Sequence, residues 1–317
     1  MSFLSALFSG KNNTGGFIIV AISALTWGTE GVIAQICYGE GMNTSTLLFF
    51  RYLVMALIFI IIAKAIGSPI LVPKDKRKVL VKLGFLSLAT SACVYWSFAL
   101  MPATLSIFFF YVYPSFACLI SHFWNKDRLG WGRIIALFIS GLGLLLLYWT
   151  SSGTIPTLGV VLALLGALSH SIGINIIGRE LTSVNKVSYT ASLGLFVTVI
   201  FGLFNCFAGK WTMDVSTSGW LYLLLLAVFS TALPTYLYVW GVAIVGAADA
   251  AIVYLLEPVS TAITAFIIFG DTLTKKQGGG ALLILGAILL QQIFIRIIKR
   301  RAVLSQTKMN EIKAKGS

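Results

Sequence analysis

Long apolar stretches dominate the chain, and only short polar segments separate them. Ten stretches are each about twenty residues long or longer: 16–36, 46–66, 80–101, 103–123, 131–149, 157–178, 187–208, 218–244, 247–269 and 277–298. A helix needs about twenty residues to cross the hydrocarbon core of a bilayer. Helices also satisfy their own backbone hydrogen bonds in lipid. The pattern therefore predicts an all-α integral membrane protein with ten transmembrane helices.

The composition agrees with this prediction. Hydrophobic residues make up 58% of the 317 residues and charged residues only 10%, whereas a water-facing surface is about a quarter charged or more. The four cysteines (Cys37, Cys93, Cys118 and Cys206) lie in or beside apolar stretches without metal-ligand spacing. We interpret them as small apolar residues and expect neither disulfides nor a metal site nor a cofactor.

The net charge of +13 lies in clusters between the apolar stretches rather than along one face. Such clusters indicate membrane orientation and not nucleic-acid binding. If both termini are cytoplasmic, nineteen of the 23 basic residues lie inside and only Lys210, Lys275 and Lys276 lie outside, with Arg51 within a helix. This asymmetry predicts cytoplasmic termini in the inner membrane, with a basic tail at 299–317 that can also contact membrane lipid.

An internal repeat joins the two halves of the chain. Three uncommon residues recur at an offset of 144: Trp96 with Trp240, Pro114 with Pro258 and Asp127 with Asp271. At an offset of 143, Trp27 aligns with His170. Each half, 1–149 and 150–298, would contain five helices. Because five is odd, the second half must enter the membrane inverted, an arrangement typical of carriers that work by alternating access.

Several short motifs, in this order over ten helices, resemble the EamA-type transporters of the drug/metabolite transporter superfamily. They are Trp27-Gly28, Phe50-Arg51-Tyr52, Tyr113-Pro114, Glu257-Pro258, Asp127-Arg128-Leu129 and Asp271-Thr272-Leu273. The resemblance implies helices one to four and six to nine around a central cavity, with helices five and ten beside them. It also implies a small-molecule substrate. His170 and Tyr52 depart from the residues that are common in that family, which bears on the substrate rather than on the fold.

Glu257 is the deepest ionisable residue, about half-way along the ninth predicted helix. An ionisable group at the bilayer centre costs at least about 2.5 kcal/mol, so its presence needs a reason. Pro258 has no N–H and deprives the carbonyl of Tyr254 of its helical partner, as Pro114 does to Phe110. A carboxylate beside freed carbonyls can bind a cation or a proton. A structural or gating role for Glu257 and the two prolines is the alternative.

Glu30 and Arg51 lie at similar predicted depths and are expected to pair. The pair is either a static staple or leaves Glu30 available to a substrate ammonium or a proton. Trp27 lies one turn before Glu30, where an indole face suits a cationic ligand. The other cavity candidates are Trp96, Tyr113, His170, Trp240, Tyr254 and Glu257. For His170, proton relay and simple helix packing are both open.

The sequence favours a secondary carrier over other classes. The chain lacks a His-Glu-x-x-His segment and a phosphate-binding loop, and its three helix-end aspartates do not suit intramembrane proteolysis. We therefore expect no enzymatic activity. The favoured function is transport of amino acids or other amino-containing solutes, as an exporter coupled to protons or to exchange. A multidrug or choline-like carrier is the alternative, and an intramembrane enzyme is a further one.

Overall fold

The computed structural model describes residues 14–125, 131–151, 156–180 and 184–294. The predicted basic tail and the Asp127-Arg128-Leu129 motif lie outside these residues. In the described residues the secondary structure is helical, without a strand. Nine described spans are long and apolar enough to cross a membrane, and α8 adds a shorter apolar stretch, Ile134–Trp149. The prediction of an all-α membrane protein is confirmed.

The ten spans are numbered here from one to ten. Five of them are built from single helices: α4 (Thr44–Ala65), α5 (Arg77–Leu100), α8 (Trp131–Ser151), α9 (Thr157–Glu180) and α10 (Lys186–Ala208), which form helices two, three, five, six and seven. The short 3₁₀ turn η1 (Lys74–Lys76) precedes α5. Helix ten runs from Lys275 to Phe294 as far as it is described.

The other four spans are interrupted. Helix one consists of α2 (Thr14–Trp27) and α3 (Glu30–Gly39), and helix four of α6 (Ala103–Phe110) and α7 (Tyr113–Asn125). Helix nine consists of α13 (Ala247–Val253) and α14 (Leu256–Phe269). In helix eight the π-helix η2 (Val228–Ala232) joins α11 (Thr217–Ala227) to α12 (Leu233–Val245).

Polar side chains fix where several helices begin. Asn43 accepts a hydrogen bond from the Thr46 N–H at 2.8 Å, and Asn185 accepts one from the Val187 N–H at 2.9 Å. These side-chain oxygens satisfy N–H groups that the first turn of a helix leaves unpaired. At the other end of α10, Gly209 adopts a left-handed conformation, with φ 59°. The chain can therefore turn back sharply between membrane spans.

Helices of the first half pack mainly against helices of the second half. α2 packs along α12 and α5 along α9, while α4 packs along α10 and α6 along α14. If each helix of one half is exchanged for its counterpart in the other half, helices one and eight become helices six and three, so the α2–α12 pair becomes the α9–α5 pair. The same exchange leaves the α4–α10 pair and the α6–α14 pair unchanged. The pairing supports the predicted repeat, whose inverted relation stays a prediction.

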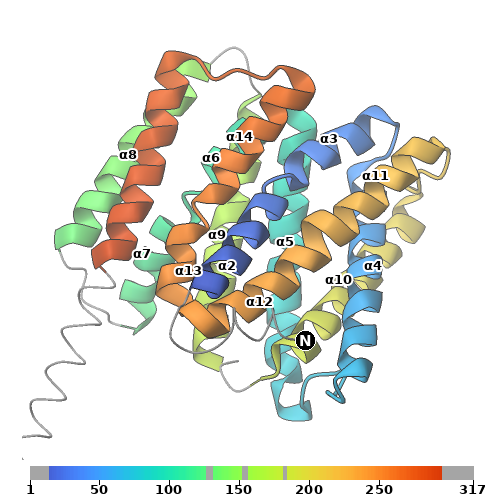
Figure 1. Ribbon diagram of the computed structural model, residues 1–317. Coiled ribbons are helices and arrows are strands. Elements are labelled where there is room, and N and C mark those ends of the chain that lie inside the picture. The colour runs from blue at the N-terminus through green and yellow to red at the C-terminus, as the bar shows by residue number, and fades with distance from the viewer. Residues whose placement is uncertain (1–13, 126–130, 152–155, 181–183, 295–317) are drawn as a thin grey trace, which may run out of the picture.

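Helices five and ten form a pair at one side of the molecule, at the left in Figure 1. Their backbones approach closely where glycines meet. A Cβ atom added to Gly143 would lie 2.8 Å from the Gly280 carbonyl oxygen, and one added to Gly280 would lie 2.9 Å from that of Gly143. Small residues at such crossings allow close helix packing in membranes.

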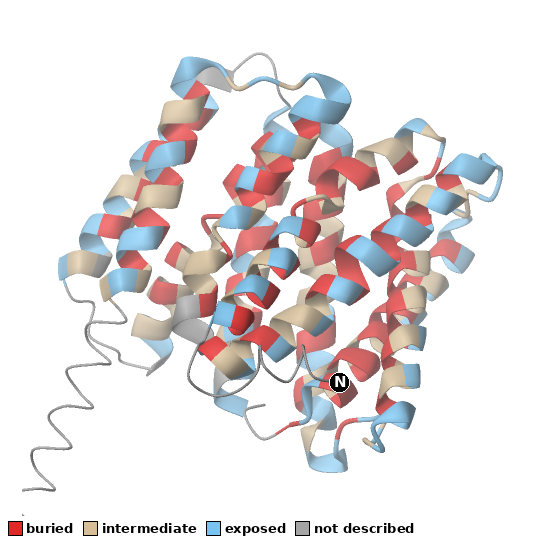
Figure 2. Cartoon of the chain, viewed as in Figure 1, coloured by how far each residue is buried: buried red, intermediate tan, exposed pale blue. Residues whose placement is uncertain are grey.

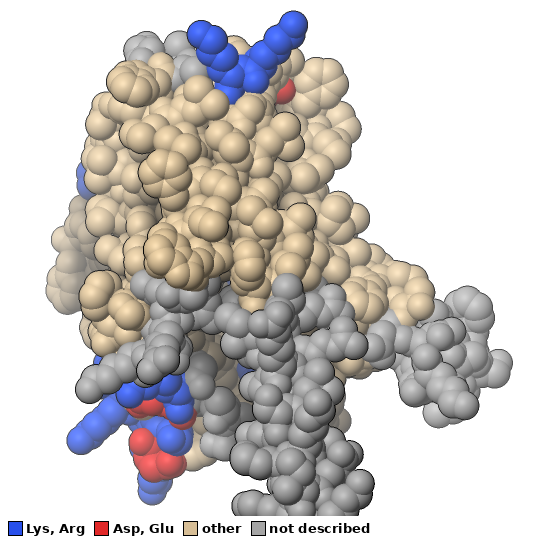
Figure 3. All heavy atoms as spheres, turned by 90° about the vertical axis from the view of Figure 1, so that its left-hand side faces the viewer, with Lys and Arg blue, Asp and Glu red and all other residues tan. Residues whose placement is uncertain are grey.

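The surface is typical of a membrane protein. Buried residues line the faces where helices meet, and exposed residues face outward (Figure 2). Many of the exposed residues are large and apolar. On the face drawn in Figure 3, charged side chains gather at the two ends, with a broad uncharged surface between them. A band of this kind matches the hydrocarbon core of a bilayer.

Candidate functional site

Three of the interrupted helices, one, four and nine, break in the middle of their spans. The α-helical geometry stops between Trp27 and Glu30 in helix one. Pro114 and Pro258 lie in the first turns of α7 and α14, where a missing backbone N–H is tolerated. The prolines could therefore indicate the breaks in helices four and nine. The break in helix one was not predicted, because Gly and Thr are also common inside continuous transmembrane helices.

Gly28 brings the break in helix one against helix nine. A Cβ atom at Gly28 would lie only 2.5 Å from the Glu257 carbonyl oxygen. From the other side of the contact, the Ser260 hydroxyl donates to the Leu25 carbonyl and the Thr261 hydroxyl donates to the Gly28 carbonyl, each at 2.7 Å. Helix nine thus supplies the donors that the broken segment of helix one lacks.

The break in helix nine is joined to helix four by Tyr111. The Tyr111 hydroxyl oxygen lies 2.8 Å from the Glu257 Oε2 and 2.9 Å from the Tyr254 carbonyl oxygen. The Glu257 N–H also donates to the Tyr254 carbonyl at 3.0 Å. The expectation of a freed carbonyl at Tyr254 is therefore wrong in this structure. Pro258 does remove the helical donor, but a phenol and a nearby amide replace it.

Aromatic rings surround this junction. The Tyr254 ring contacts the Trp27 ring edge-on, with centroids 6.0 Å apart, and the Tyr238 ring at 4.8 Å. The Tyr254 hydroxyl is also hydrogen-bonded to the hydroxyl of Ser23. The Tyr113 ring lies 4.8 Å from the His170 ring. The structure thus brings five of the candidates together around one junction: Trp27, Tyr113, His170, Tyr254 and Glu257.

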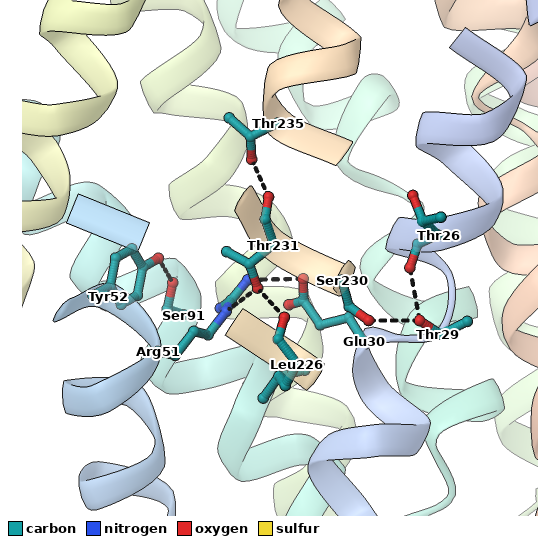
Figure 4. Close-up of polar contacts among 10 residues, drawn as sticks. All are labelled: Thr26, Thr29, Glu30, Arg51, Tyr52, Ser91, Leu226, Ser230, Thr231 and Thr235. Atoms are coloured by element: carbon teal, nitrogen blue, oxygen red, sulfur yellow. Dashed lines mark hydrogen bonds and ion pairs between the residues drawn. The ribbon is translucent and has the colours of Figure 1, made fainter. Parts of the chain in front are cut away.

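Glu30 and Arg51 form an ion pair between α3 and α4 (Figure 4). The Arg51 Nη2 lies 2.8 Å from the Glu30 Oε2, and the side chains are only 6% and 13% exposed. The Arg51 Nε donates to the Thr231 hydroxyl at 2.9 Å. Burial of either charge alone would be costly, whereas the pair with a further acceptor is tolerable. The expected pairing of Glu30 with Arg51 is observed, and both of its interpretations, a static staple and a carboxylate available to a ligand, stay predictions.

The ion pair connects the two halves of the chain. Thr231 lies in the π-helix η2, and its hydroxyl donates to the Leu226 carbonyl at 2.9 Å. Next to it, the hydroxyls of Ser230 and Thr29 are 2.6 Å apart. The Arg51 guanidinium also lies 4.7 Å from the centroid of the Tyr95 ring. Cation–π contact of this kind stabilises a desolvated guanidinium.

The other two tryptophan candidates lie on helices three and eight. Trp96 is partly buried against the main apolar core, and Trp240 is 41% exposed on α12. The predicted cavity role of both tryptophans stays untested.

Two pockets lie elsewhere, near the ends of helices one, three and nine. One has a volume of about 340 Å³ and is lined by residues such as Gln35 and Asp271, and the other measures about 560 Å³ between α6, α14 and helix ten. Burial raises the pKa of Asp271 above its usual range. Neither of these two pockets is lined by Glu257 or Glu30. At the junction itself Tyr111 and Tyr254 are buried, whereas Trp27, Tyr113 and Glu257 are partly exposed.

Three contributors to the site were missed from the sequence, namely Tyr111, Tyr238 and Thr231. Tyr111 is two residues before Tyr113 and close to Pro114, so the helix break was a possible signal. Tyr238 and Thr231 had none, because an apolar span gives no sign of which polar residue meets a distant partner.

The fold and this site define the class: a polytopic helical membrane protein whose broken helices meet around buried charged and aromatic side chains. The chain belongs to the EamA-like transporter family, because the model of that family matches residues 14–149 and again 157–291. It is thus an integral membrane protein of a transporter family, and this membership points to a transporter rather than an enzyme.

Relatives and a solved structure agree with this membership. The chain is 25% identical over 280 residues to an uncharacterized transporter of Archaeoglobus fulgidus. The matched region covers 87% of this chain and 95% of the relative. It is 26% identical to the uncharacterized inner membrane transporter YicL of Salmonella typhimurium, covering 87% and 94%. A crystal structure with 16% identity matches 90% of this chain and 99% of its own, with a TM-score of 0.67, and shows the shared fold.

Proposed function

We propose that the protein is a secondary carrier that moves small amino-containing solutes across the cytoplasmic membrane by alternating access. Its two halves would be inverted five-helix repeats that rock against each other. The family model matches the chain twice, and helices pair between the halves as a two-fold exchange requires. Both termini are cytoplasmic in this proposal, as the distribution of basic residues favours.

The single observation that carries the proposal is the junction of broken helices around Glu257. Discontinuous helices near the membrane midplane are typical of carrier binding sites, because opened backbone and half-helix ends can meet a substrate. The breaks in helices one and nine touch at Gly28, and helix four joins them through Tyr111. Movement between the halves would change the access to this junction.

The chemistry of the junction suits an ammonium group. Glu257 offers carboxyl oxygens, and Tyr254 offers an aromatic ring. An ammonium group has three donors and no acceptor. The ring of Trp27 adds a face for cation–π contact. Arg51, the buried guanidinium nearby, already pairs with Glu30. We therefore propose an amino-containing substrate, coupled to protons through Glu257 and moved outward.

Purified protein in liposomes tests this proposal. Uptake or release would be measured under imposed pH and substrate gradients, with amino acids, quaternary amines, sugars and nucleotides as the panel. We expect an amino-containing solute to move, with a rate that depends on the pH gradient. Movement of quaternary amines alone would favour the multidrug or choline-like alternative. If no solute crosses under any gradient, the carrier function is refuted.

A pair of glutamate variants links transport to the junction. Glu257→Gln should abolish movement driven by the pH gradient. Glu40→Gln removes a carboxyl from the end of helix one, where it bonds to the Ser218 hydroxyl at 3.0 Å, and should leave transport intact. Equal behaviour of the two variants would exclude Glu257 as the coupling group.

A further inference from the structure

The hydroxyl of Tyr111 has more acceptors than hydrogens. A phenol has one O–H donor. The Tyr111 oxygen nevertheless lies within hydrogen-bond distance of two acceptors, the Tyr254 carbonyl at 2.9 Å and the Glu257 Oε2 at 2.8 Å. With an ionised Glu257, only one of these two short contacts is a hydrogen bond. The other would place two lone-pair oxygens in contact without a hydrogen between them.

A protonated Glu257 removes this conflict. Its O–H donates to the Tyr111 oxygen, and the Tyr111 O–H then donates to the Tyr254 carbonyl. Two hydrogens thereby serve the two contacts. On ionisation, the Tyr111 O–H turns to the carboxylate, because a hydrogen bond to a charged acceptor is about twice as strong as a neutral one. The Tyr254 carbonyl then loses its donor from helix four.

We propose that Glu257, Tyr111 and the Tyr254 carbonyl form a proton-operated latch between helix four and helix nine, closed when a proton is bound and open when it leaves. The latch deepens the proposed function and rests on it, because it assigns the coupling proton to a position and to a mechanical effect. Tyr111 acts as a positioning residue that transmits the protonation state of Glu257 to the backbone at the break.

The surroundings of Glu257 contain other ionisable groups but no unpaired positive charge among the described neighbours. Tyr113, Tyr238 and Tyr254 face it with phenols, and α3 contributes the carboxyl of Glu30. The neighbouring segments α2 and α6 contain no ionisable residue in their sequences. Arg51 neutralises Glu30 at 2.8 Å. Protonation of Glu257 is therefore the local way to remove its charge.

Two substitutions separate the latch from a simple loss of packing. In Glu257→Gln, the amide N–H can donate to the Tyr111 oxygen, as the protonated acid does, so the latch should stay closed at every pH. In Tyr111→Phe, the ring remains but the connection is lost, so the latch should stay open. Tyr38→Phe is the matched control, since the Tyr38 hydroxyl also donates to a main-chain carbonyl, that of Tyr95, at 2.9 Å.

The experiment uses the full chain in liposomes and needs no substrate. Infrared difference spectroscopy between acidic and alkaline buffer would detect the protonated carboxyl groups, and Glu257→Gln should remove one component, the band of the Glu257 acid. Tyr111→Phe should shift the band, because the acid loses its hydrogen-bond acceptor. Tyr38→Phe should leave the band unchanged.

Hydrogen exchange at the α13–α14 junction, corrected for intrinsic rates, reports on the latch itself. In the wild type and in Tyr38→Phe, these amides should exchange about fivefold faster once Glu257 ionises, the factor for one net hydrogen bond. Glu257→Gln should stay slow and Tyr111→Phe fast throughout.

A carboxyl difference spectrum that is the same in Glu257→Gln as in the wild type would overturn the proposal, as would wild-type exchange in Tyr111→Phe. Either result could occur in a protein that still transports solute, so it would not refute the carrier function. Conversely, a latch that responds to pH in a chain that moves no solute would refute the carrier function alone.

Discussion

Helix one and helix six hold corresponding places in the predicted repeat, yet they differ in form. Helix one is broken after Trp27, whereas α9 runs unbroken past His170. At the junction with helix one, helix nine donates through Ser260 to the Leu25 carbonyl. At the corresponding contact the direction is reversed, since Ser171 of helix six donates to the Tyr113 carbonyl of helix four at 2.7 Å.

The difference teaches where polar side chains are needed. In both contacts the acceptor carbonyl belongs to a broken helix, helix one or helix four, and the donor comes from the helix packed against it, which is the broken helix nine in the first contact and the unbroken helix six in the second. A break in lipid exposes carbonyl groups, and an unsatisfied one is costly. The polar residues thus follow the breaks rather than the repeat, and the two halves have diverged in their side chains while keeping the same helix pairs.

The largest effect on stability should come from removing the charge of Arg51, which belongs to an ion pair without a counterpart in the second half. At an offset of 143, Glu30 and Arg51 correspond to Gly173 and Gly194. Arg51→Met leaves the buried Glu30 without its partner and should cost about 3–5 kcal/mol of unfolding free energy. Adding Glu30→Gln should recover part of this loss. A double-mutant cycle from reversible unfolding in detergent measures the coupling, and simple additivity would show that the pair is unimportant.

Adding a methyl group at Gly28, where helices one and nine are in close contact, should have the next largest effect on stability. In Gly28→Ala the new methyl group meets the Glu257 backbone at 2.5 Å, so we expect a loss of about 1–3 kcal/mol. Gly173→Ala in helix six is the control, since its nearest neighbour is the Leu83 Cδ2 at 4.0 Å. That variant should be neutral or stabilised by up to about 1 kcal/mol. Thermal unfolding of both would test the comparison, and equal midpoints would contradict it.

Smaller effects should follow from removing single donors on each side. Ser260→Ala leaves the Leu25 carbonyl without this donor and should cost about 1 kcal/mol. Ser171→Ala should cost less, because the Ser171 hydroxyl is shared between Tyr113 and the Ala167 carbonyl of its own helix at 2.6 Å. Unfolding free energies in the same detergent would rank the two, and the reverse order would contradict the role of the breaks.

The smallest effect is expected at His170. Its ring packs between those of Phe110, at 5.4 Å, and Tyr113. His170→Phe preserves this packing, so we expect a stability change within about 0.5 kcal/mol and an unchanged pH profile of transport. The profile is measured in liposomes, and a shifted profile would instead indicate that His170 relays protons.

The sequence predicted the helices better than the junction. Spans such as 187–208 match the observed α10 (Lys186–Ala208) because apolar length alone decides whether a helix crosses the membrane. The pairing of Glu30 with Arg51 was also expected, because both residues lie at similar predicted depths in the membrane. By contrast, Tyr111 and Glu257 are 146 residues apart. The hydrophobic periodicity of a sequence does not indicate a contact between residues so far apart. Tyr111 is also one of eleven tyrosines in the chain, and nothing in its local sequence singles it out as the partner of Glu257.

The acceptors in this junction have a consequence for how the protein tolerates substitution. Ser260, Thr261, Tyr111 and Ser171 all donate to main-chain carbonyls, those of Leu25, Gly28, Tyr254 and Tyr113. Every amino acid has a carbonyl group, so a substitution at an acceptor position preserves the hydrogen bond, provided that the new side chain fits. A substitution at a donor position abolishes it. The two ends of each bond are therefore under unequal selection, and a saturation scan should find isolated intolerant hydroxyls facing permissive partners.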